Sequence, residues 1–249
     1  MAIGTRSYAS PYASRSGLPT GVKWLLIANT VVWLLQQLPI AFLNNFLSYL
    51  QLVPQEVVRF AIWQLVTYMF LHGGILHILF NMLTLWMFGR EIEETWGTRR
   101  FLNYYFICGI GAGICIVLFN YLLPHGQPGG ATIGASGAIY GLLLASAVLW
   151  PDRIIYFNFL FPIKMKWLVI LYGALAFYSS FDASSGVSNI GHLGGLLVGL
   201  VYLKTPRMRR FDPLSLLRQQ YRDWKLARAK RKFQVYLKKQ GSDRGPWVN

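Results

Sequence analysis

Charged residues are scarce in this sequence, and acidic residues are scarcer still. Of the 249 residues, 13% are charged and 54% are apolar, with 9 acidic against 24 basic side chains. Soluble proteins average about 25% charged residues, so this chain cannot cover a globular surface of its size with polar groups. The same composition excludes a disordered or collagen-like chain. We therefore expect an integral membrane protein.

Cysteine is almost absent, which excludes a disulfide scaffold. The two cysteines, Cys108 and Cys115, lie seven residues apart in one apolar run. On a helix this spacing places them about 10 Å apart on one face, too far for a disulfide bond. We expect both to be packing residues.

Six apolar runs predict membrane-spanning helices, at residues 22–43, 71–89, 101–123, 131–150, 166–181 and 187–203. The second, fifth and sixth fall at or below the ~20 residues that a ~30 Å hydrocarbon core requires. The first run lacks a small-residue cleavage site, so we expect a retained span and not a signal peptide. Residues 44–70 are too interrupted to span the bilayer and too apolar to be fully exposed to water, which predicts an interfacial loop.

The predicted fold is therefore an all-α polytopic membrane protein in three parts. Residues 1–21 form a flexible lead, residues 22–203 a six-helix core, and residues 204–249 a basic tail. With the N-terminus in the cytoplasm, 23 of the 24 basic residues fall on the cytoplasmic side and Arg59 falls on the other. Because Lys and Arg accumulate in cytoplasmic loops, both termini are predicted to be cytoplasmic.

The tail alternates basic residues with Leu, Trp, Tyr and Phe at roughly helical spacing. This pattern is typical of an amphipathic helix on anionic lipid. A solvated basic tail explains it equally well. RNA binding is the least favoured reading, and no nucleic-acid partner is expected.

Polar side chains within the predicted spans point to a site. No acidic residue lies in mid-span, which argues against a proton-coupled transporter or a cation channel. His77 and Asn81 are four apart and share a helical face. Counted from the cytoplasmic end of each span, His77, Ser136 and His192 lie at about 18, 21 and 16 Å. In a ~30 Å core all three are then roughly 10 Å beneath the outer surface.

Glycines beside these residues predict close helix packing. Small residues recur every four positions in two spans, at Gly191, Gly195 and Gly199 and at Gly137, Gly141 and Ala145. Such spacing lets helix backbones approach one another closely in lipid. It would allow a serine on one helix and a histidine on another to come within about 3 Å.

The chemistry that these residues permit is nucleophilic. A serine hydroxyl attacks only when a base takes its proton, and His192 is the candidate base for Ser136 and the later acid for the leaving amine. No acid within the spans is placed to orient His192, and Asp182, in the outer loop ten residues upstream of it, is an unfavoured third member. We therefore predict a Ser–His dyad in place of a triad.

An acyl transition state also needs hydrogen-bond donors for its oxyanion. The Asn81 amide, His77 and the Ser136 backbone N–H are the candidate donors. Gly134 and Gly137 leave room for a scissile backbone beside Ser136. We expect neither a metal ion nor a cofactor.

With these residues in place, the chain resembles the rhomboid intramembrane serine proteases. The resemblance covers about residues 22–203 and is carried by W-Q at 63–64, H-G-G-I-L-H-I-L-F-N at 72–81, F-G-R-E-I-E at 88–93, G-T-R-R-F at 97–101, G-A-S-G-A-I-Y-G at 134–141 and G-H-L-G-G-L-L-V-G at 191–199. It implies a six-helix bundle whose membrane-embedded first loop is residues 44–70. It further implies that Ser136 is the nucleophile and His192 its base, with Tyr140 packed on the His192 ring.

The same resemblance assigns the supporting residues. His77 and Asn81 match the family's oxyanion positions, and His72 matches a second, non-catalytic histidine. Glu93 matches a carboxylate that holds the cytoplasmic end of the second span. The fifth span, which carries the bulky residues Tyr172, Phe177, Tyr178 and Phe181, would form the lateral gate.

The resemblance also implies substrates, which are transmembrane segments of other proteins cut near their outer ends. Two alternatives remain: a catalytically inactive rhomboid-like membrane chaperone or trafficking factor, and a small transporter. The six-span layout favours the bacterial inner membrane over a eukaryotic organelle. Transmembrane protein substrates and membrane lipid are the expected partners, and the sequence indicates no particular oligomeric state.

Overall fold

The computed structural model describes residues 17–122, 129–157, 161–181, 186–205 and 215–242. It is largely helical and divides into two compact units, residues 1–209 and 210–249. The first unit holds every segment of the rhomboid resemblance. The second holds the helix of the basic tail.

The first apolar run ends earlier than the sequence predicts. Helix α1 spans Thr20–Gln36 instead of reaching residue 43, because Pro39 lacks the N–H that a continuing helix needs. Residues 41–70 then form the short elements α2 (Ala41–Ser48), α3 (Pro54–Val58), α4 (Gln64–Thr67) and the 3₁₀ turn η1 (Tyr68–Phe70). The W-Q pair holds this segment together. Gln64 accepts a hydrogen bond from the Val53 N–H, and both Trp63 and Gln64 donate to the Tyr49 carbonyl.

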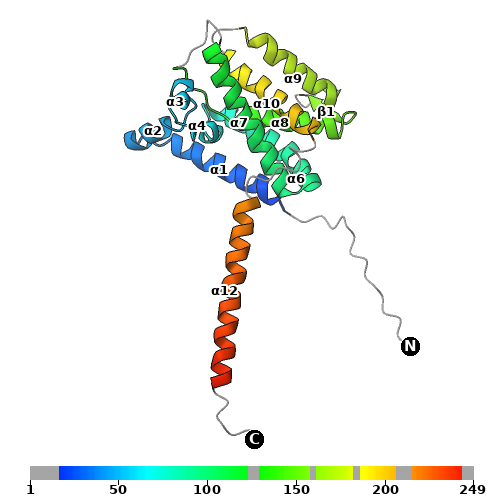
Figure 1. Ribbon diagram of the computed structural model, residues 1–249. Helices are drawn as coiled ribbons and strands as arrows, with labels where there is room; N and C mark the ends of the chain where they lie inside the picture. The colour runs from blue at the N-terminus through cyan, green and yellow to red at the C-terminus, as the bar shows by residue number, and fades with distance from the viewer. Residues whose placement is uncertain (1–16, 123–128, 158–160, 182–185, 206–214, 243–249) are drawn as a thin grey trace, which may run out of the picture. The chain divides into compact units, whose positions relative to one another are not determined.

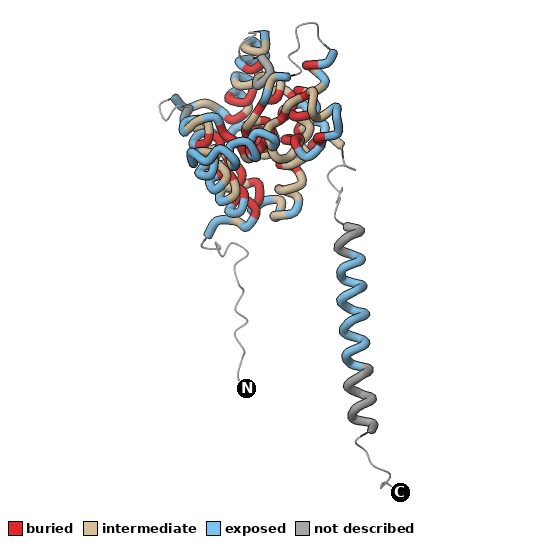
Figure 2. The backbone as a smooth tube through the Cα atoms, turned by 90° about the vertical axis from the view of Figure 1, so that its left-hand side faces the viewer, coloured by how far each residue is buried: buried red, intermediate tan, exposed pale blue. Residues whose placement is uncertain are grey.

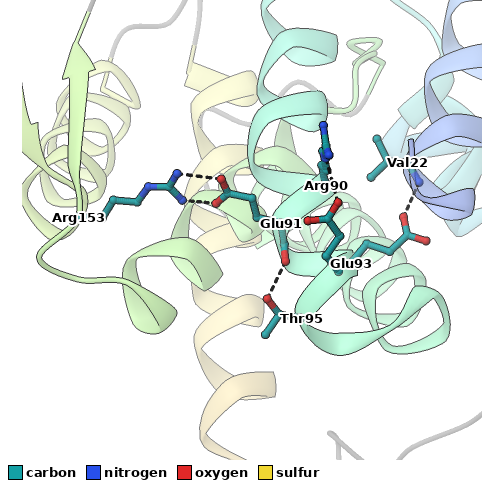
Figure 3. A network of polar contacts seen from close by, with 7 residues as sticks. Val22, Arg90, Glu91, Glu93, Thr95 and Arg153 are labelled. Atoms are coloured by element: carbon teal, nitrogen blue, oxygen red, sulfur yellow. Dashed lines mark hydrogen bonds and ion pairs between the residues drawn. The ribbon is translucent and has the colours of Figure 1, made fainter. Parts of the chain in front are cut away.

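The second run forms one continuous helical element. Helix α5 (Ile75–Thr84) continues through the π turn η2 (Leu85–Gly89) into α6 (Arg90–Trp96). In α6 the buried Glu93 carboxylate accepts a hydrogen bond from the Gly21 N–H at 2.8 Å. It accepts a second one from the Val22 N–H at 2.7 Å (Figure 3). These two N–H groups belong to the first turn of α1, where the backbone donors have no acceptor within their own helix and the helix dipole is positive. Glu93 thus joins two helices that lie 70 residues apart in the chain.

The centre of the first unit is formed by α7 (Thr98–Leu122), α8 (Ser136–Leu149) and α10 (Gly186–Lys204). These three helices contact one another more extensively than any other helices do, and α9 (Met165–Ser179) packs along α10 and α8 (Figure 1). Cys108 is buried in this core, Cys115 is half-buried, and both thiols are free, as their spacing predicts.

A β-hairpin departs from the all-α prediction. Strands β1 (Ile154–Phe157) and β2 (Phe161–Lys164) pair antiparallel with Ile155 opposite Ile163, where the sequence predicts a plain loop. The segment is rich in β-branched and aromatic residues, which favour a strand. Ile155 and Ile163 also pack on a small buried cluster that includes Met165 and Leu168.

Among the described residues, one ion pair joins the start of this hairpin to α6, and two more lie around the hairpin itself. Glu91 and Arg153 form a two-pronged pair in which Arg153 Nη2 lies 2.8 Å from Glu91 Oε1 (Figure 3). Asp152 accepts hydrogen bonds from Lys166 at 2.8 Å and from Lys164 at 3.3 Å. These two lysines hold the pKa of the Asp152 carboxyl below its ordinary value. Salt bridges therefore connect α6 to the hairpin and the hairpin to the start of α9.

Glu91→Gln is expected to lower the free energy of unfolding by about 1 kcal/mol, because a two-pronged pair between separate elements exceeds an ordinary surface pair. Thermal unfolding in detergent measures the change. Glu94→Gln is the matched control, since Glu94 pairs with Arg90 inside the same helix at 2.9 Å. Such i,i+4 pairs contribute about 0.3–0.5 kcal/mol. Equal effects of the two variants would show that the hairpin is not held by Glu91.

Large apolar side chains face outward over the first unit. Phe42, Phe60 and Tyr178 are 82%, 86% and 79% exposed, while buried residues gather inside the bundle (Figure 2). By length and hydropathy, one described helix, Thr98–Leu122, could cross a bilayer alone, and the pair Gln64–Phe70 and Ile75–Trp96, bent by 99°, would be a second candidate. The apolar helices Ser136–Leu149 and Met165–Ser179 are shorter. The count of six spans stays a prediction.

The second unit contains α12 (Ser215–Ser242), a helix of 28 residues. Every described side chain in it, from Gln219 to Phe233, is exposed (Figure 2). The sequence predicts helical spacing here, and the structure shows a single continuous helix.

Candidate active site

Ser136 is the first residue of α8, and the backbone before it is held from two sides. Gly134 has φ +124°, a conformation that side-chain-bearing residues rarely adopt. Its N–H donates to the Tyr68 carbonyl at 2.9 Å. Just upstream, Leu52 and Thr132 exchange two backbone hydrogen bonds of 3.0 and 2.8 Å. The Ser136 hydroxyl therefore lies at the start of a helix, and hydrogen bonds fix the backbone that leads into it.

His192 on α10 faces this serine. Its Nε2 lies 2.9 Å from Ser136 Oγ, within hydrogen-bonding distance. The Tyr140 ring, one turn further along α8, stacks on the imidazole with centroids 4.3 Å apart and planes within 5°. The buried Nδ1 of His192 has no partner among the described residues. Asp182, the unfavoured third member, lies outside them.

Contact between glycine backbones brings the two helices together. A Cβ on Gly195 would collide with the Gly137 carbonyl, lying 2.8 Å from its carbon. A Cβ on Gly137 would lie 3.4 Å from the Gly191 carbonyl oxygen and would press on Ala112. Because neither residue carries a side chain, α8 and α10 approach closely enough for Ser136 and His192 to meet.

His77 and Asn81 lie on α5, across a cavity from the serine. The cavity has a volume of about 410 Å³, and its lining includes Ser136, His192, His77, Asn81, Gly134 and Tyr140. His77 Nδ1 accepts a long hydrogen bond of 3.4 Å from the Gly73 N–H, which leaves Nε2 as the donor. A Cβ on Gly134 would be 2.7 Å from this Nε2. Gly134 is thus required both for its backbone angle and for space.

The Asn81 amide is placed as a donor without a partner. The residue is 6% exposed, and its Nδ2 makes no hydrogen bond to any described residue. An unpaired buried donor lowers stability. An Asn81 amide left without a partner beside the cavity is therefore consistent with a donor whose acceptor is present only during the reaction. The N–H of Ser136 is also without an intrahelical acceptor, because it belongs to the first turn of α8.

His72 occupies a different place. It is buried, and its ring meets the His77 ring edge-on with centroids 5.0 Å apart. Its backbone N–H donates to Gln36 Oε1 at the end of α1, and neither ring nitrogen has a partner among the described residues. His72 therefore supports the His77 side of the site and does not reach Ser136 by any observed contact.

Tyr68 supports the site and was not predicted from the sequence. Its carbonyl holds Gly134, and its phenol donates to the Gly109 carbonyl on α7 at 2.7 Å. Both contacts join residues more than 40 positions apart. The sequence shows only a tyrosine four residues before the H-G-G segment, which does not reveal what Tyr68 contacts.

The arrangement suits acyl transfer. One hydroxyl faces one imidazole, and up to three donors surround the adjacent cavity, from Asn81, His77 and the Ser136 backbone. Among the described residues, no group of three or more His, Cys, Asp or Glu side chains is placed to hold a metal ion.

The comparisons with known proteins agree on one family. The rhomboid domain model matches residues 59–208. RHOMBOID-like protein 1 of Arabidopsis thaliana is 33% identical over 165 residues, which are 64% of this chain and 39% of the relative. Rhomboid protease GluP of Bacillus subtilis (strain 168) is 38% identical over 137 residues, 55% and 24% of the two chains. Rhomboid-like protease 3 of Toxoplasma gondii is 30% identical over 142 residues, 57% and 51%. The matches thus cover about a quarter to a half of these relatives.

Proposed function

Since the chain belongs to the rhomboid family and is therefore an integral membrane protein, we propose that it is an intramembrane serine endopeptidase that cleaves transmembrane segments of other proteins. Ser136 is the nucleophile and His192 is its base. The observation that carries the proposal is the 2.9 Å approach of Ser136 Oγ to His192 Nε2 beside a cavity that also holds unpaired donors.

Catalysis begins when Ser136 Oγ attacks the scissile carbonyl carbon and His192 Nε2 takes the hydroxyl proton. The carbonyl oxygen gains the negative charge, and the Asn81 amide, His77 and the Ser136 N–H donate hydrogen bonds to it. The C–N bond then breaks as the imidazolium returns its proton to the leaving amine. Water, activated by the same imidazole, hydrolyses the acyl-enzyme and regenerates Ser136.

No described acid contacts His192, and Tyr140 orients the base in place of one. A stacked ring fixes the plane of the imidazole, so that Nε2 points at Ser136. A positive ring over an aromatic face is also stabilised by the aromatic quadrupole. The dyad therefore forms its ion pair without a buried carboxylate.

The membrane placement follows the charge distribution. Six spans with both termini in the cytoplasm place 23 of the 24 basic residues on that side. The Ser136–His192 pair then lies nearer the outer surface, and a substrate helix must unwind locally to expose a carbonyl. We assign the protein to a bacterial inner membrane, with single-pass membrane proteins as substrates and the surrounding lipid as a further contact.

The fifth predicted span, α9, is proposed as the gate. Its Tyr172 ring meets Tyr140 edge-on at 6.2 Å, so α9 directly contacts the residue that orients His192. Phe177, Tyr178 and Phe181 near its end are 58%, 79% and 77% exposed. Outward movement of this end would open the cavity to a substrate from the lipid side.

A serine-directed fluorophosphonate tests the assignment of Ser136. The full-length protein in detergent should be labelled, and both Ser136→Ala and His192→Ala should abolish labelling. Ser146→Ala is the matched control, because Ser146 is buried on the same helix and donates only to the Leu142 carbonyl. Labelling that survives Ser136→Ala would reject this nucleophile. Absence of labelling in wild type would favour an inactive family member or a transporter.

Asn81→Ala is expected to reduce kcat by about 10²–10³-fold while leaving KM nearly unchanged, because one oxyanion donor acts mainly in the transition state. Asn120→Ala is the control, since the Asn120 amide is buried and bonds the Ile116 carbonyl of its own helix. Cleavage of a transmembrane substrate in proteoliposomes measures both. An unchanged kcat would remove Asn81 from the mechanism.

A further inference from the structure

Helix α12 presents two faces that differ in their charged and aromatic side chains. At 3.6 residues per turn, one face collects Tyr221, Trp224, Lys225, Arg228, Arg231 and Lys232, which we name the aromatic–basic face. The opposite face collects Arg222, Asp223, Leu226, Lys230 and Phe233. The aromatic–basic face carries four cations and no acid. The opposite face carries two cations and the one acidic residue among the described side chains of α12.

The aromatic side chains of the aromatic–basic face contact each other and a nearby arginine. The rings of Tyr221 and Trp224 stack with centroids 5.9 Å apart. The Arg228 guanidinium lies 5.4 Å from the Trp224 ring centroid. Tyr221 and Trp224 are 61% and 55% exposed, so no described residue of the second unit covers this cluster.

We propose that the aromatic–basic face of α12 docks on the anionic lipid surface of the membrane in which the first unit is embedded. The proposal rests on the chain being a membrane protein, and not on its catalytic activity. Tyr and Trp rings prefer the level of the lipid headgroups, and Lys and Arg bury their stems while their charges stay with phosphate. Both residue types lie on the aromatic–basic face, and the one described acidic residue lies on the opposite face.

The length of chain between the two units favours lipid over another polyanion. Ten residues separate Lys204, the last residue of α10, from Ser215, the first of α12. Fully extended, they and the two bonds at their ends reach about 36–40 Å. The helix is therefore tethered near the bilayer at a high effective concentration. An RNA would have to be recruited from solution to occupy the same face.

Hydrogen exchange on the full-length protein in nanodiscs tests this proposal without any activity assay. The amides of residues 219–233 should exchange at least about fivefold more slowly when about a third of the lipid is phosphatidylglycerol than in pure phosphatidylcholine. The protection should disappear near 1 M salt, where charges are screened beyond about 3 Å. Equal exchange in the two lipids would overturn the proposal.

Two charge-matched double variants identify the face. Because each cation near an anionic leaflet contributes about fivefold to binding, Arg228→Gln with Lys232→Gln should weaken docking about 25-fold. Arg222→Gln with Lys230→Gln removes the same charge from the opposite face and should have less than about a fifth of that effect. Equal loss in both pairs would contradict a defined docking face. Protection by single-stranded RNA but not by phosphatidylglycerol would assign α12 to nucleic acid and reject the proposal.

Discussion

Ser136→Ala is expected to lower kcat for cleavage of a transmembrane substrate by about 10⁴–10⁶-fold, the range seen when a serine nucleophile or its base is removed. His192→Ala should have an effect of the same size, because the hydroxyl does not attack unless a base takes its proton. The double variant should lose no more than either single variant. Residues that act as one unit are strongly non-additive, and Ser136 and His192 form such a unit at 2.9 Å.

Cleavage in proteoliposomes, with product measured over long incubation, gives the three rate constants. Thermal unfolding of each variant checks that the fold is retained. Ser146→Ala should remain within about twofold of wild type, because loss of one hydroxyl bonded to its own helix costs only about 1 kcal/mol of stability. Additive losses in the double variant would mean that Ser136 and His192 act in separate steps, which the proposed dyad does not allow.

Gly195→Ala should also have a large effect, with activity reduced by at least about 10²-fold. A methyl group at this position would meet the Gly137 carbonyl carbon at 2.8 Å and its Cα at 3.1 Å. These are backbone atoms, so α8 and α10 must separate. A displacement of about 1 Å between reacting groups is sufficient for a 10²-fold loss. The unfolding temperature should fall as well, because the helices would lose close contact along their length.

Gly173→Ala is the matched control for this substitution. Gly173 lies within α9, and a Cβ there would meet Leu196 Cδ1 at 3.4 Å, the end of a flexible side chain. Alanine is the better helix former by about 1 kcal/mol, so stability should be unchanged or slightly raised and cleavage retained. Equal activity of Gly195→Ala and Gly173→Ala would contradict the requirement for bare backbone between α8 and α10.

Much of the site follows from local sequence pattern. The i,i+4 spacing of His77 and Asn81 requires only that α5 be helical. The four-residue spacing from Ser136 to Tyr140 likewise places the ring one turn beyond the hydroxyl. The glycines at 191 and 195 predict close approach to another helix, and the structure places Gly195 against Gly137 of α8 and Gly191 against Ile116 of α7.

Other features depend on partners that no local pattern specifies. The Tyr68 carbonyl holds Gly134 across 66 residues, and Glu93 holds the start of α1 across more than 70. The hairpin at Ile154–Lys164 is stable because its Ile155–Ile163 pair finds a buried cluster to pack on. Sequence periodicity describes one element at a time, so it indicates that a residue will be buried and not what will bury it.

Local sequence is enough to show that the chain is apolar and helical, to name the candidate residues for nucleophilic chemistry, and to show how the charges are distributed between the loops. These properties belong to single residues or to one helical repeat. Packing between distant segments is needed to show that Ser136 meets His192, that the Asn81 amide has no partner among the described residues at the cavity, and that Glu91 and Arg153 join α6 to the hairpin. Each of these depends on distances of a few ångströms between segments far apart in the chain, and such distances are set by the packing of all the helices together.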